Sequence, residues 1–394
     1  MDSPLCYGTN VHPAEDLPDI LAMLEGPAAA VRERFAPGGT LGLGLWLPRA
    51  AARTLAGSPH GAEEVRARLR DLGLRVDTVN AFPAGDFHGP RVKERVYAPD
   101  WSDPRRLDYT VDVGRALARL LEPGTTCVAS TLPGTWNRWR RGPQERRALA
   151  RGLAAAASSL ADLADATGVR TVLAPEPEPG CTLESAEEAE AFWRADLPLA
   201  LGDGAARLLP HLGLCADLCH LAVAGEDPAA ALGRLRRAGV PVPKVQVSAA
   251  LEVARPAEEG AAVEALRRFD EPRWLHQAAG RDRLGVWRRA ADLPEVFADL
   301  DAWRRLAPWR VHFHAPLDGD EVAGVRTTRG LVPPALRALA AAGPPFPVLE
   351  VETYTWSAVP GFQGPPGDLA DRIAAELRFV ADSLRDAPVP RMPA

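Results

Sequence analysis

Short apolar runs with the character of β-strands recur along this chain, and Ala/Leu/Arg-rich segments with helical periodicity separate them. A strand and a helix alternate every roughly 30–45 residues, about eight times, which predicts a (β/α)8 barrel with a parallel sheet inside and helices outside. The runs are Leu5–His12, Thr40–Leu47, Leu74–Asn80, Thr126–Thr131, Arg170–Ala174, Leu212–Ala216, Pro243–Ser248, Arg310–His314 and Pro347–Glu352. This set contains one run more than a barrel needs, and we expect the surplus in the wide interval from Ala249 to Leu349.

No convincing domain boundary interrupts the chain. Its 394 residues are ample for one large barrel with a sizeable core. We therefore expect a single TIM-barrel domain over residues 1–385, with extended loops and an inserted segment at about 249–310. Residues 386–394 are rich in proline and are expected to form a flexible tail.

Composition excludes several classes of function. The formal net charge is -6 and the sequence pI is about 5.8, so the chain lacks the basic surface that nucleic-acid binding requires. No apolar run is long enough to span a bilayer. Five scattered cysteines, an odd number, fit reduced thiols and a cytoplasmic location. We therefore expect a small-molecule partner and no nucleic acid.

Polar side chains of the kinds that bind metals or substrates gather where the predicted strands end. In a (β/α)8 barrel the C-terminal strand ends and the loops after them form the functional face. Asp217 and His220 have an i, i+3 spacing, which brings a carboxylate and an imidazole to one side of a helical turn. The other such residues are Asn10, His12, Asn80, Asp86, His88, Glu176, Glu178, Gln246, His312, His314, Glu350 and Glu352.

Several carboxylates brought together in a barrel mouth would repel one another and be costly to bury, and a divalent cation resolves that conflict. Oxygen and nitrogen donors without thiolate pairs favour Mn, Zn, Co or Mg. Such a metal assists proton transfer beside a carbonyl or activates water for hydrolysis, and the residues alone leave both open. We expect the metal ligands among Glu176, Asp217, His220, Gln246, His312, His314 and Glu350.

Glu176 and Glu350 are the candidate catalytic proton carriers. Glu176 lies nearer its strand than Glu178, and Glu350 is preferred to Glu352 because Tyr354 and Trp356 have the character of wall residues. Residues expected to contact substrate are Asn10, His12, Asn80, Asp86, His88, Trp136, Glu178, Glu352 and Tyr354.

Structural roles remain open for some of these residues. His12 precedes Pro13 and could cap a turn, and one of His312 and His314 could be a core histidine. Lys244 shares strand parity with Gln246, which leaves a Schiff-base aldolase as a further alternative. Hydrolysis of damaged DNA is disfavoured by the acidic net charge.

The pattern of strand-end residues resembles the xylose-isomerase-like barrels, a superfamily of sugar isomerases, epimerases and the endonuclease IV group. That superfamily has Glu after strand five, Asp-x-x-His after strand six, His or an equivalent at strand seven and Glu after strand eight. The matching residues here are Glu176, Asp217 with His220, Gln246 and Glu350. An amide is a weaker ligand than an imidazole or a carboxylate, so substrate contact is an alternative role for Gln246.

A closer resemblance is to EboE, the barrel protein of the bacterial ebo cluster and a metabolite traffic family. The similar segments are Thr78–His88, Val92–Tyr97, Pro99–Trp101, Pro175–Cys181, Trp274–Gln277 and Leu349–Trp356. The resemblance implies a role in moving a secondary-metabolite precursor, with a prenyltransferase-like membrane protein of the same cluster as partner.

Two functions follow as expectations. The first is a divalent-metal isomerase or epimerase that acts on a sugar-like or other small polar metabolite by proton transfer. The second is a non-catalytic protein that binds a metabolite and passes it to the membrane partner.

Overall fold

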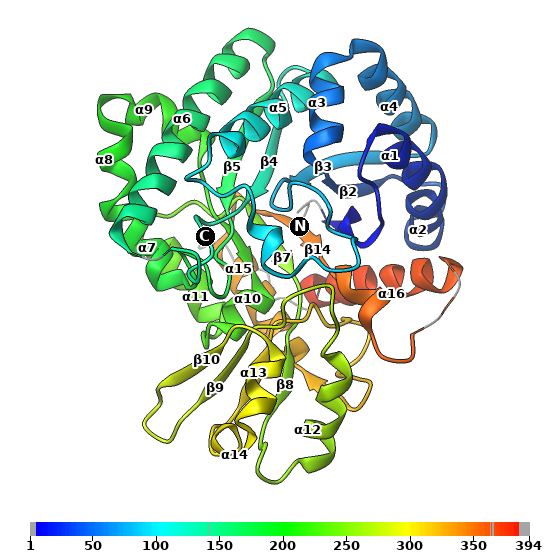
Figure 1. The fold of residues 1–394 in the computed structure, drawn as a ribbon. Helices are drawn as coiled ribbons and strands as arrows, with labels where there is room; N and C mark the ends of the chain where they lie inside the picture. Colours follow the sequence, from blue (N-terminus) through cyan, green and yellow to red (C-terminus); the bar gives the residue numbers. More distant parts are fainter. Residues whose placement is uncertain (1–4, 141, 363, 365, 386–394) are drawn as a thin grey trace, which may run out of the picture.

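Eight parallel strands form a nearly closed barrel in the computed structural model, which describes residues 5–140, 142–362, 364 and 366–385 (Figure 1). Their order is β5-β4-β3-β2-β1-β14-β7-β6, and the main chain of Leu173 in β5 meets the segment Leu212–Gly213 before β6. The strands are β1 (Leu5–Gly8), β2 (Leu41–Trp46), β3 (Leu74–Asn80), β4 (Thr126–Thr131), β5 (Arg170–Pro175), β6 (Cys215–Asp217), β7 (Lys244–Val247) and β14 (Val348–Val351). The predicted (β/α)8 barrel is confirmed. The tail predicted at 386–394 lies outside the described residues.

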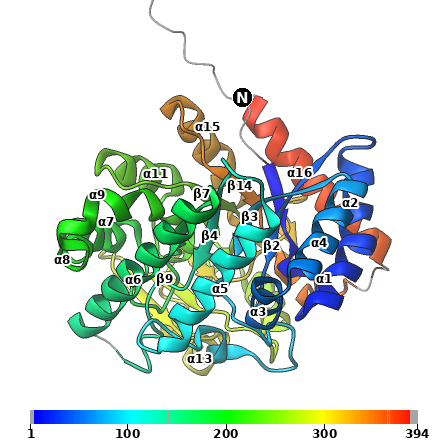
Figure 2. The same cartoon turned by 90° about the horizontal axis from the view of Figure 1, so that it is seen from above.

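Helices surround the barrel strands, as the view from above shows (Figure 2). Apolar side chains fill the space between the two layers, with Leu43 and Val245 from strands meeting Leu117 and Leu377 from helices in one buried cluster. The barrel helices are α1 (Leu17–Met23), α2 (Ala29–Phe35), α3 (Arg49–Gly57), α4 (Pro59–Asp71), α5 (Pro104–Leu120), α6 (Pro143–Thr167), α7 (Ala186–Ala195), α8 (Leu197–Leu201), α9 (Ala205–Leu208), α10 (Leu218–Val223), α11 (Pro228–Arg237), α15 (Val332–Ala342) and α16 (Pro366–Arg385). Among the described helices, none combines the length and the apolar character needed to cross a membrane.

The barrel interior is polar as well as apolar. A Cβ atom at Gly44 in β2 would lie 2.1 Å from the Oε2 atom of Glu350, so glycine leaves the room that this carboxylate occupies. Gly44 therefore helps to place a charged side chain inside the barrel.

A second sheet of six strands interrupts the barrel between β7 and β14 and forms the lower part of Figure 1. All its pairings are antiparallel. Its strands in spatial order are β10 (Trp287–Ala290), β9 (Ala278–Arg281), β11 (Trp309–Val311), β8 (Leu251–Val253), β13 (Val325–Thr327) and β12 (Glu321–Val322). Its helices are α12 (Gly260–Leu266), α13 (Leu293–Ala298) and α14 (Leu300–Trp303).

This inserted sheet accounts for the surplus run of the sequence pattern. The run Arg310–His314 contains the end of β11, which pairs with β8 and β9 and not with a barrel strand. The sheet also continues to Thr327, past the boundary expected near residue 310, because the β12–β13 hairpin pairs with β8. The inserted segment has an apolar cluster of its own, which includes Trp303, Trp309 and Phe313.

Candidate functional site

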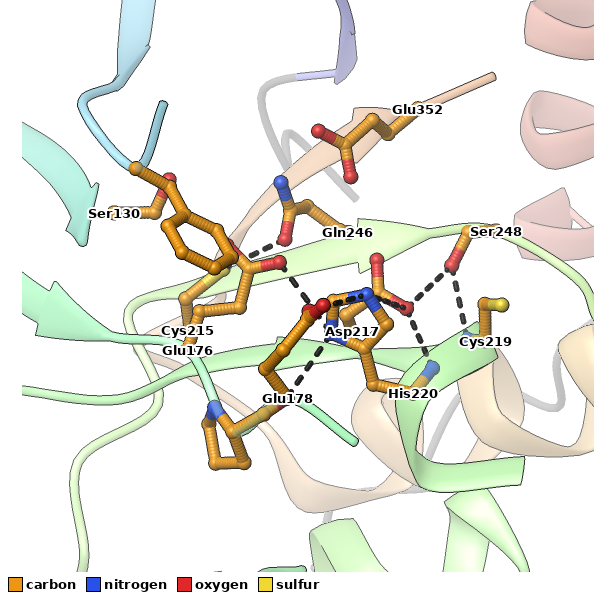
Figure 3. Close-up of polar contacts among 12 residues, drawn as sticks. Ser130, Glu176, Glu178, Cys215, Asp217, Cys219, His220, Gln246, Ser248 and Glu352 are labelled. Carbon is orange, nitrogen blue, oxygen red and sulfur yellow. Dashed lines mark hydrogen bonds and ion pairs between the residues drawn. The ribbon is translucent and has the colours of Figure 1, made fainter. Parts of the chain in front are cut away.

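Carboxylates, imidazoles and amides from distant parts of the chain converge at the C-terminal mouth of the barrel. Barrel strand ends supply most of them, and His312 and His314 enter from the inserted sheet, directly after β11. The expected site residues that line the pocket are Asn10, Asn80, Glu176, Glu178, His220, His312, His314, Glu352 and Tyr354. Figure 3 shows the side of this site formed by β5, β6, β7 and β14.

Glu176, Asp217 and Glu352 form the first donor group, here called the carboxylate group. One oxygen atom from each lies within 4.8 Å of the other two, and all three side chains are buried. Asp217 also caps α10, because its Oδ1 atom accepts hydrogen bonds from the His220 main-chain N–H at 2.8 Å and the Ser248 hydroxyl at 2.9 Å. The Nδ2 groups of Asn10 and Asn80 donate to Glu352 Oε1 at 2.8 and 3.0 Å.

The carboxylate group carries more negative charge than its surroundings compensate. Glu176 Oε2 and Asp217 Oδ2 are buried and have no hydrogen-bond partner among the described residues. Burial raises the pKa of Glu176, and the nearby charges of Glu352 and Asp217 raise it further. Burial likewise raises the pKa of Asp217 and of Glu352. The group must therefore hold protons or a cation.

A second set of possible donors, here called the imidazole group, consists of His220, His312, His314 and Glu178. Donor atoms of Glu178, His220 and His312 lie within 4.8 Å of one another, as do those of Asp217, His220 and His314. Each ring directs Nδ1 at a carbonyl oxygen: Pro177 O for His220 at 3.0 Å, Gln277 Oε1 for His312 at 2.7 Å, and Glu352 O for His314 at 3.0 Å. A carbonyl oxygen only accepts, so these partners assign the proton to Nδ1 and leave a lone pair on Nε2. Burial lowers the pKa of His220 and of His312, which favours their neutral rings.

The Nε2 atoms of His312 and His314 both lie near Nε2 of His220. His220 Nε2 lies 3.2 Å from His312 Nε2 and 3.3 Å from His314 Nε2, and Glu178 Oε2 is 3.1 Å away. Asp217 stands between the two groups, with Oδ1 3.9 Å from His220 Nε2 and Oδ2 4.0 Å from His314 Nε2.

Two expected ligands, Glu350 and Gln246, are not brought to either group. Glu350 lies within β14, whereas Glu352 follows the end of this strand, nearer the barrel mouth. The Oε2 atom of Glu350 is 2.8 Å from Lys244 Nζ. Gln246 Oε1 accepts a hydrogen bond from the Cys215 thiol at 3.2 Å. Both side chains point into the barrel, because alternate residues of a strand face the same side. They lie farther from the barrel mouth than the pocket does, and both are fully buried.

Lys244 does not have the properties of a Schiff-base amine. It donates to Ser130 Oγ at 3.1 Å and pairs with Glu350. Burial alone lowers the pKa of Lys244, but Glu350, Cys215 and Glu176 together more than reverse that effect and hold the pKa above its ordinary value. A nucleophilic lysine needs the opposite shift, so this ion pair disfavours the aldolase alternative.

The remaining expected substrate contacts do not line the pocket. His12 is buried beside the Tyr7 hydroxyl at 3.4 Å, and burial lowers its pKa to about 3. His88 contacts Asn10 O at 2.8 Å, and the exposed Asp86 forms an ion pair with Arg95 at 3.3 Å. Trp136 stacks on Tyr97 with ring centroids 4.8 Å apart.

Sequence reasoning missed the residues that cover the pocket. Lys93 Nζ lies 2.6 Å from Asp292 Oδ2 and 2.8 Å from Trp274 O, which joins the loop after β3 to the inserted segment. The main-chain N–H groups of Val92 and Lys93 also donate to Arg273 O at 2.8 and 2.7 Å. The cavity beneath this cover has a volume of about 40 Å³, and its aromatic wall includes Phe87, Tyr97, Trp274 and Tyr354.

A signal for part of this cover was present in the sequence. Lys93, Tyr97 and Trp274 lie in the segments Val92–Tyr97 and Trp274–Gln277, which stand out in the sequence without an assigned role. The lack of a second cysteine pair argues in the sequence against Cys215 and Cys219 as metal ligands, although the Cys219 sulfur lies within 4.8 Å of donor atoms of His312 and His314.

The fold and the mouth residues define a class: a (β/α)8 barrel with a buried cluster of metal-type donors at the C-terminal ends of its strands. Residues 44–263, more than half of the chain, match the family model described as xylose isomerase-like TIM barrel. The chain belongs to the xylose isomerase-like TIM barrel family.

A solved structure agrees with this fold. The chain is similar to an L-ribulose 3-epimerase, with 14% identity over 100% of both chains and a TM-score of 0.53. It is also similar to a xylose isomerase domain protein from Planctomyces limnophilus, with 13% identity, 91% of this chain and 92% of that chain covered, and a TM-score of 0.48. Identities this low establish the fold and not the reaction. No curated protein matches the sequence.

Proposed function

We propose that this protein is a divalent-metal-dependent isomerase or epimerase that moves a proton beside a carbonyl group of a sugar-like or other small polar metabolite. The observation that carries the proposal is the carboxylate group. Glu176, Asp217 and Glu352 are buried with donor atoms within 4.8 Å of one another, and two of their oxygen atoms have no hydrogen-bond partner among the described residues.

The residues present fit a divalent cation. Glu176 Oε2 and Asp217 Oδ2 are available oxygen donors. Asn10 and Asn80 donate to Oε1 of Glu352, and its Oε2 atom, which lies 3.4 Å from His314 Nδ1, would be the third donor. An all-oxygen set suits Mn or Mg. When bound, the cation would polarise the carbonyl of the substrate.

Glu176 and Glu352 are the proposed proton carriers. Burial raises the pKa of both carboxyl groups, which favours their protonated forms and suits groups that give a proton to substrate and take one back. The two residues extend from different strands, β5 and β14, and so can approach a substrate carbon from different directions. Glu352 takes the role that the sequence pattern gave to Glu350.

The residues that line the pocket suit a ligand with both apolar and hydroxylated faces, and the cover must open to admit it, because about 40 Å³ is too small for a sugar-sized molecule. Tyr354, Trp274 and Phe87 offer ring faces, while Asn80 and Glu178 offer polar groups. Aromatic rings stack on the C–H faces of such molecules, and polar groups fix their orientation. The EboE resemblance favours, within this class, a precursor of a secondary metabolite in an ebo-type cluster.

A non-catalytic carrier is the second candidate, and the contacts of Lys93 across the pocket are the observation that favours it. The cover formed by Lys93, Asp292 and Trp274 would keep a bound metabolite from solvent until a partner released it. In that case the partner would be the prenyltransferase-like membrane protein of the same cluster.

Deuterium exchange distinguishes between a catalytic function and a carrier function. The purified protein, loaded with Mn or Mg, is incubated in D₂O with a panel of aldoses, ketoses and cyclitols, and proton NMR follows exchange beside the carbonyl. We expect exchange with at least one compound and a loss of about 100-fold or more in Glu352→Gln and Glu176→Gln. His211→Gln is the matched control, because His211 is buried but lies outside the pocket. Metal binding without exchange would favour the carrier.

A further inference from the structure

We propose that a cavity between the barrel and the inserted sheet is a separate binding site for an uncharged, polyhydroxylated ring, such as the sugar ring of a glycoside. This space, here called the side cavity, has a volume of about 350 Å³. Ligand pockets typically have volumes of roughly 300–1,000 Å³, so the side cavity is large enough for such a ring. Its lining includes no member of the carboxylate group, so this site goes beyond the proposed function and needs no metal.

The barrel side of the side cavity is a wall that main-chain hydrogen bonds hold in place. It consists of the loops after β4 and β5. The Asn137 N–H group donates to Gly180 O at 2.8 Å, and the Thr182 N–H group donates to Thr135 O at 3.0 Å. The Asn137 side chain adds a bond of 2.6 Å from Nδ2 to Cys181 O. Because this wall is ordered before a ligand arrives, binding costs little conformational entropy.

Two tryptophans, Trp136 from the barrel and Trp287 from β10, supply the aromatic part of the lining. Each indole lies against a glycine. A Cβ atom at Gly180 would overlap the ring of Trp136, and one at Gly225 would overlap the ring of Trp287. Both glycines also have a left-handed φ, of 82° and 92°, which disfavours any other residue. Aromatic rings with an apolar face and a polar edge suit the C–H faces and hydroxyl groups of a sugar ring.

Glu184 offers a hydrogen-bond acceptor that the protein itself leaves unused. Its Oε1 atom accepts from Asn137 Nδ2 at 3.0 Å. Its Oε2 atom is buried and has no hydrogen-bond partner among the described residues, although Arg289 Nε lies 3.3 Å away. A buried carboxylate oxygen without a hydrogen bond is costly, and a ligand hydroxyl group would satisfy it.

The charges around the side cavity cancel in pairs, which favours an uncharged ligand. Arg289 is paired with Glu184. The two terminal nitrogen atoms of Arg138 lie 2.7 and 2.8 Å from the two carboxylate oxygen atoms of Glu295. A phosphate or carboxylate group would have to take one of these arginines from its partner and leave a carboxylate unpaired. A hydroxylated ring leaves both pairs intact.

Small side chains on the inserted sheet leave the space that the ring would occupy. Ala278 and Ala279 of β9, Ala290 of β10 and the adjacent Ala291 all line the side cavity. Alanine at these positions contributes only a methyl group, so the two strands do not fill the gap with their own side chains.

Gln277 separates the side cavity from the pocket at the barrel mouth, because it lines both. Its Nε2 group donates to the Tyr97 hydroxyl at 2.7 Å and to Pro179 O at 3.0 Å. These bonds tie the inserted segment to the barrel at the boundary between the two spaces. The side cavity is therefore a distinct site beside the mouth.

Calorimetric titration of the full chain with methyl glucoside, galactoside and mannoside, in the presence of a chelator, tests this site. We expect one molecule of at least one glycoside to bind per chain without metal. Trp287→Ala and Glu184→Gln should each weaken that binding by about 10-fold or more, because they remove a ring contact and a charged acceptor. Trp193→Ala is the matched control, since Trp193 is half-buried in α7 and lines neither space, and it should bind as wild type does.

Hydrogen exchange locates the bound glycoside, which should slow amide exchange in β9 and β10. Circular dichroism checks the folding of each variant, and Glu184→Gln stands in if Trp287→Ala does not fold. The site is wrong if no glycoside binds, if binding survives both substitutions, or if protection is confined to residues 92–97 at the mouth. Glucose 6-phosphate that binds more tightly than the glucoside, and loses this advantage in Arg138→Gln, would overturn the uncharged class. A chain that binds a glycoside but no metal would overturn the proposed function and leave this site intact.

Discussion

Lys244 and Glu350 form an ion pair inside the barrel, with Nζ and Oε2 2.8 Å apart and neither residue exposed. Removing one partner of such a pair leaves the other charge buried and unpaired. We expect Lys244→Met to lower the free energy of unfolding by about 3–5 kcal/mol. Urea denaturation measures this, and the double variant Lys244→Met/Glu350→Leu should recover most of the loss. A single variant as stable as wild type would contradict this interpretation.

Glu350 and Glu352 should differ in their effect on metal binding. Glu352 belongs to the carboxylate group, whereas Glu350 contacts Lys244 below it. We expect Glu352→Gln to weaken manganese binding by about 10-fold or more, because a charged oxygen donor is lost. Glu350→Gln should lower stability and leave manganese affinity within a few-fold of wild type. Isothermal titration calorimetry compares the two, and the reverse ranking would restore Glu350 as the ligand.

Metal removal should destabilise the folded protein. Without a cation, the carboxylates of Glu176, Asp217 and Glu352 are buried near one another with two oxygen atoms unpartnered among the described residues. A ligand at 100 times its dissociation constant stabilises the native state by about 2.7 kcal/mol. We therefore expect a chelator to lower the melting temperature by several degrees and added Mn or Zn to restore it. Calorimetry with equal sodium chloride in place of the metal provides the control.

Glu376 in α16 should make stability depend on pH. Burial raises its pKa to about 7, although Leu317 N–H and the Thr353 hydroxyl donate to its Oε1 atom at 2.9 and 2.7 Å. Between the unfolded pKa of about 4.3 and the folded value of about 7, the folded state binds the proton more tightly, so stability falls as pH rises, by up to about 3–4 kcal/mol.

Glu376→Gln removes this proton equilibrium. We expect the stability of wild type minus that of the variant to be larger at pH 5 than at pH 8, by about 3 kcal/mol. Urea denaturation at both pH values in the presence of a chelator measures the difference. An equal difference at both pH values would show that Glu376 does not titrate in this range.

The cover of the pocket should open when its ion pair is removed. Lys93→Met deletes the contacts of Nζ with Asp292 and Trp274 O, while Asp292 still accepts from the main-chain N–H groups of His276 and Leu293. We expect faster amide hydrogen exchange over residues 92–97 and 271–277, and unchanged exchange in the barrel strands. Arg95→Met, which removes only the surface pair with Asp86, is the matched control.

The local sequence pattern was sufficient to predict the barrel and one motif at its mouth. Alternation of apolar runs with helical segments predicts a parallel barrel because both periodicities are set by neighbouring residues. The strand-end positions of Glu176 and Asp217, and the turn that joins Asp217 to His220, follow from the same local geometry.

Tertiary structure decided which of the inward residues meet. Glu350 and Glu352 face the same side of their segment, so the sequence alone could not show which of them reaches the pocket. Lys244 on the neighbouring strand and the space left by Gly44 place Glu350 in the barrel interior, below the pocket. His312 and His314 reach the barrel mouth only because the inserted sheet packs beside it, and the pairing of β11 with β8 and β9 depends on residues distant in the chain. Depth and long-range pairing are properties of the folded whole, since they are set by neighbours in space and not along the sequence.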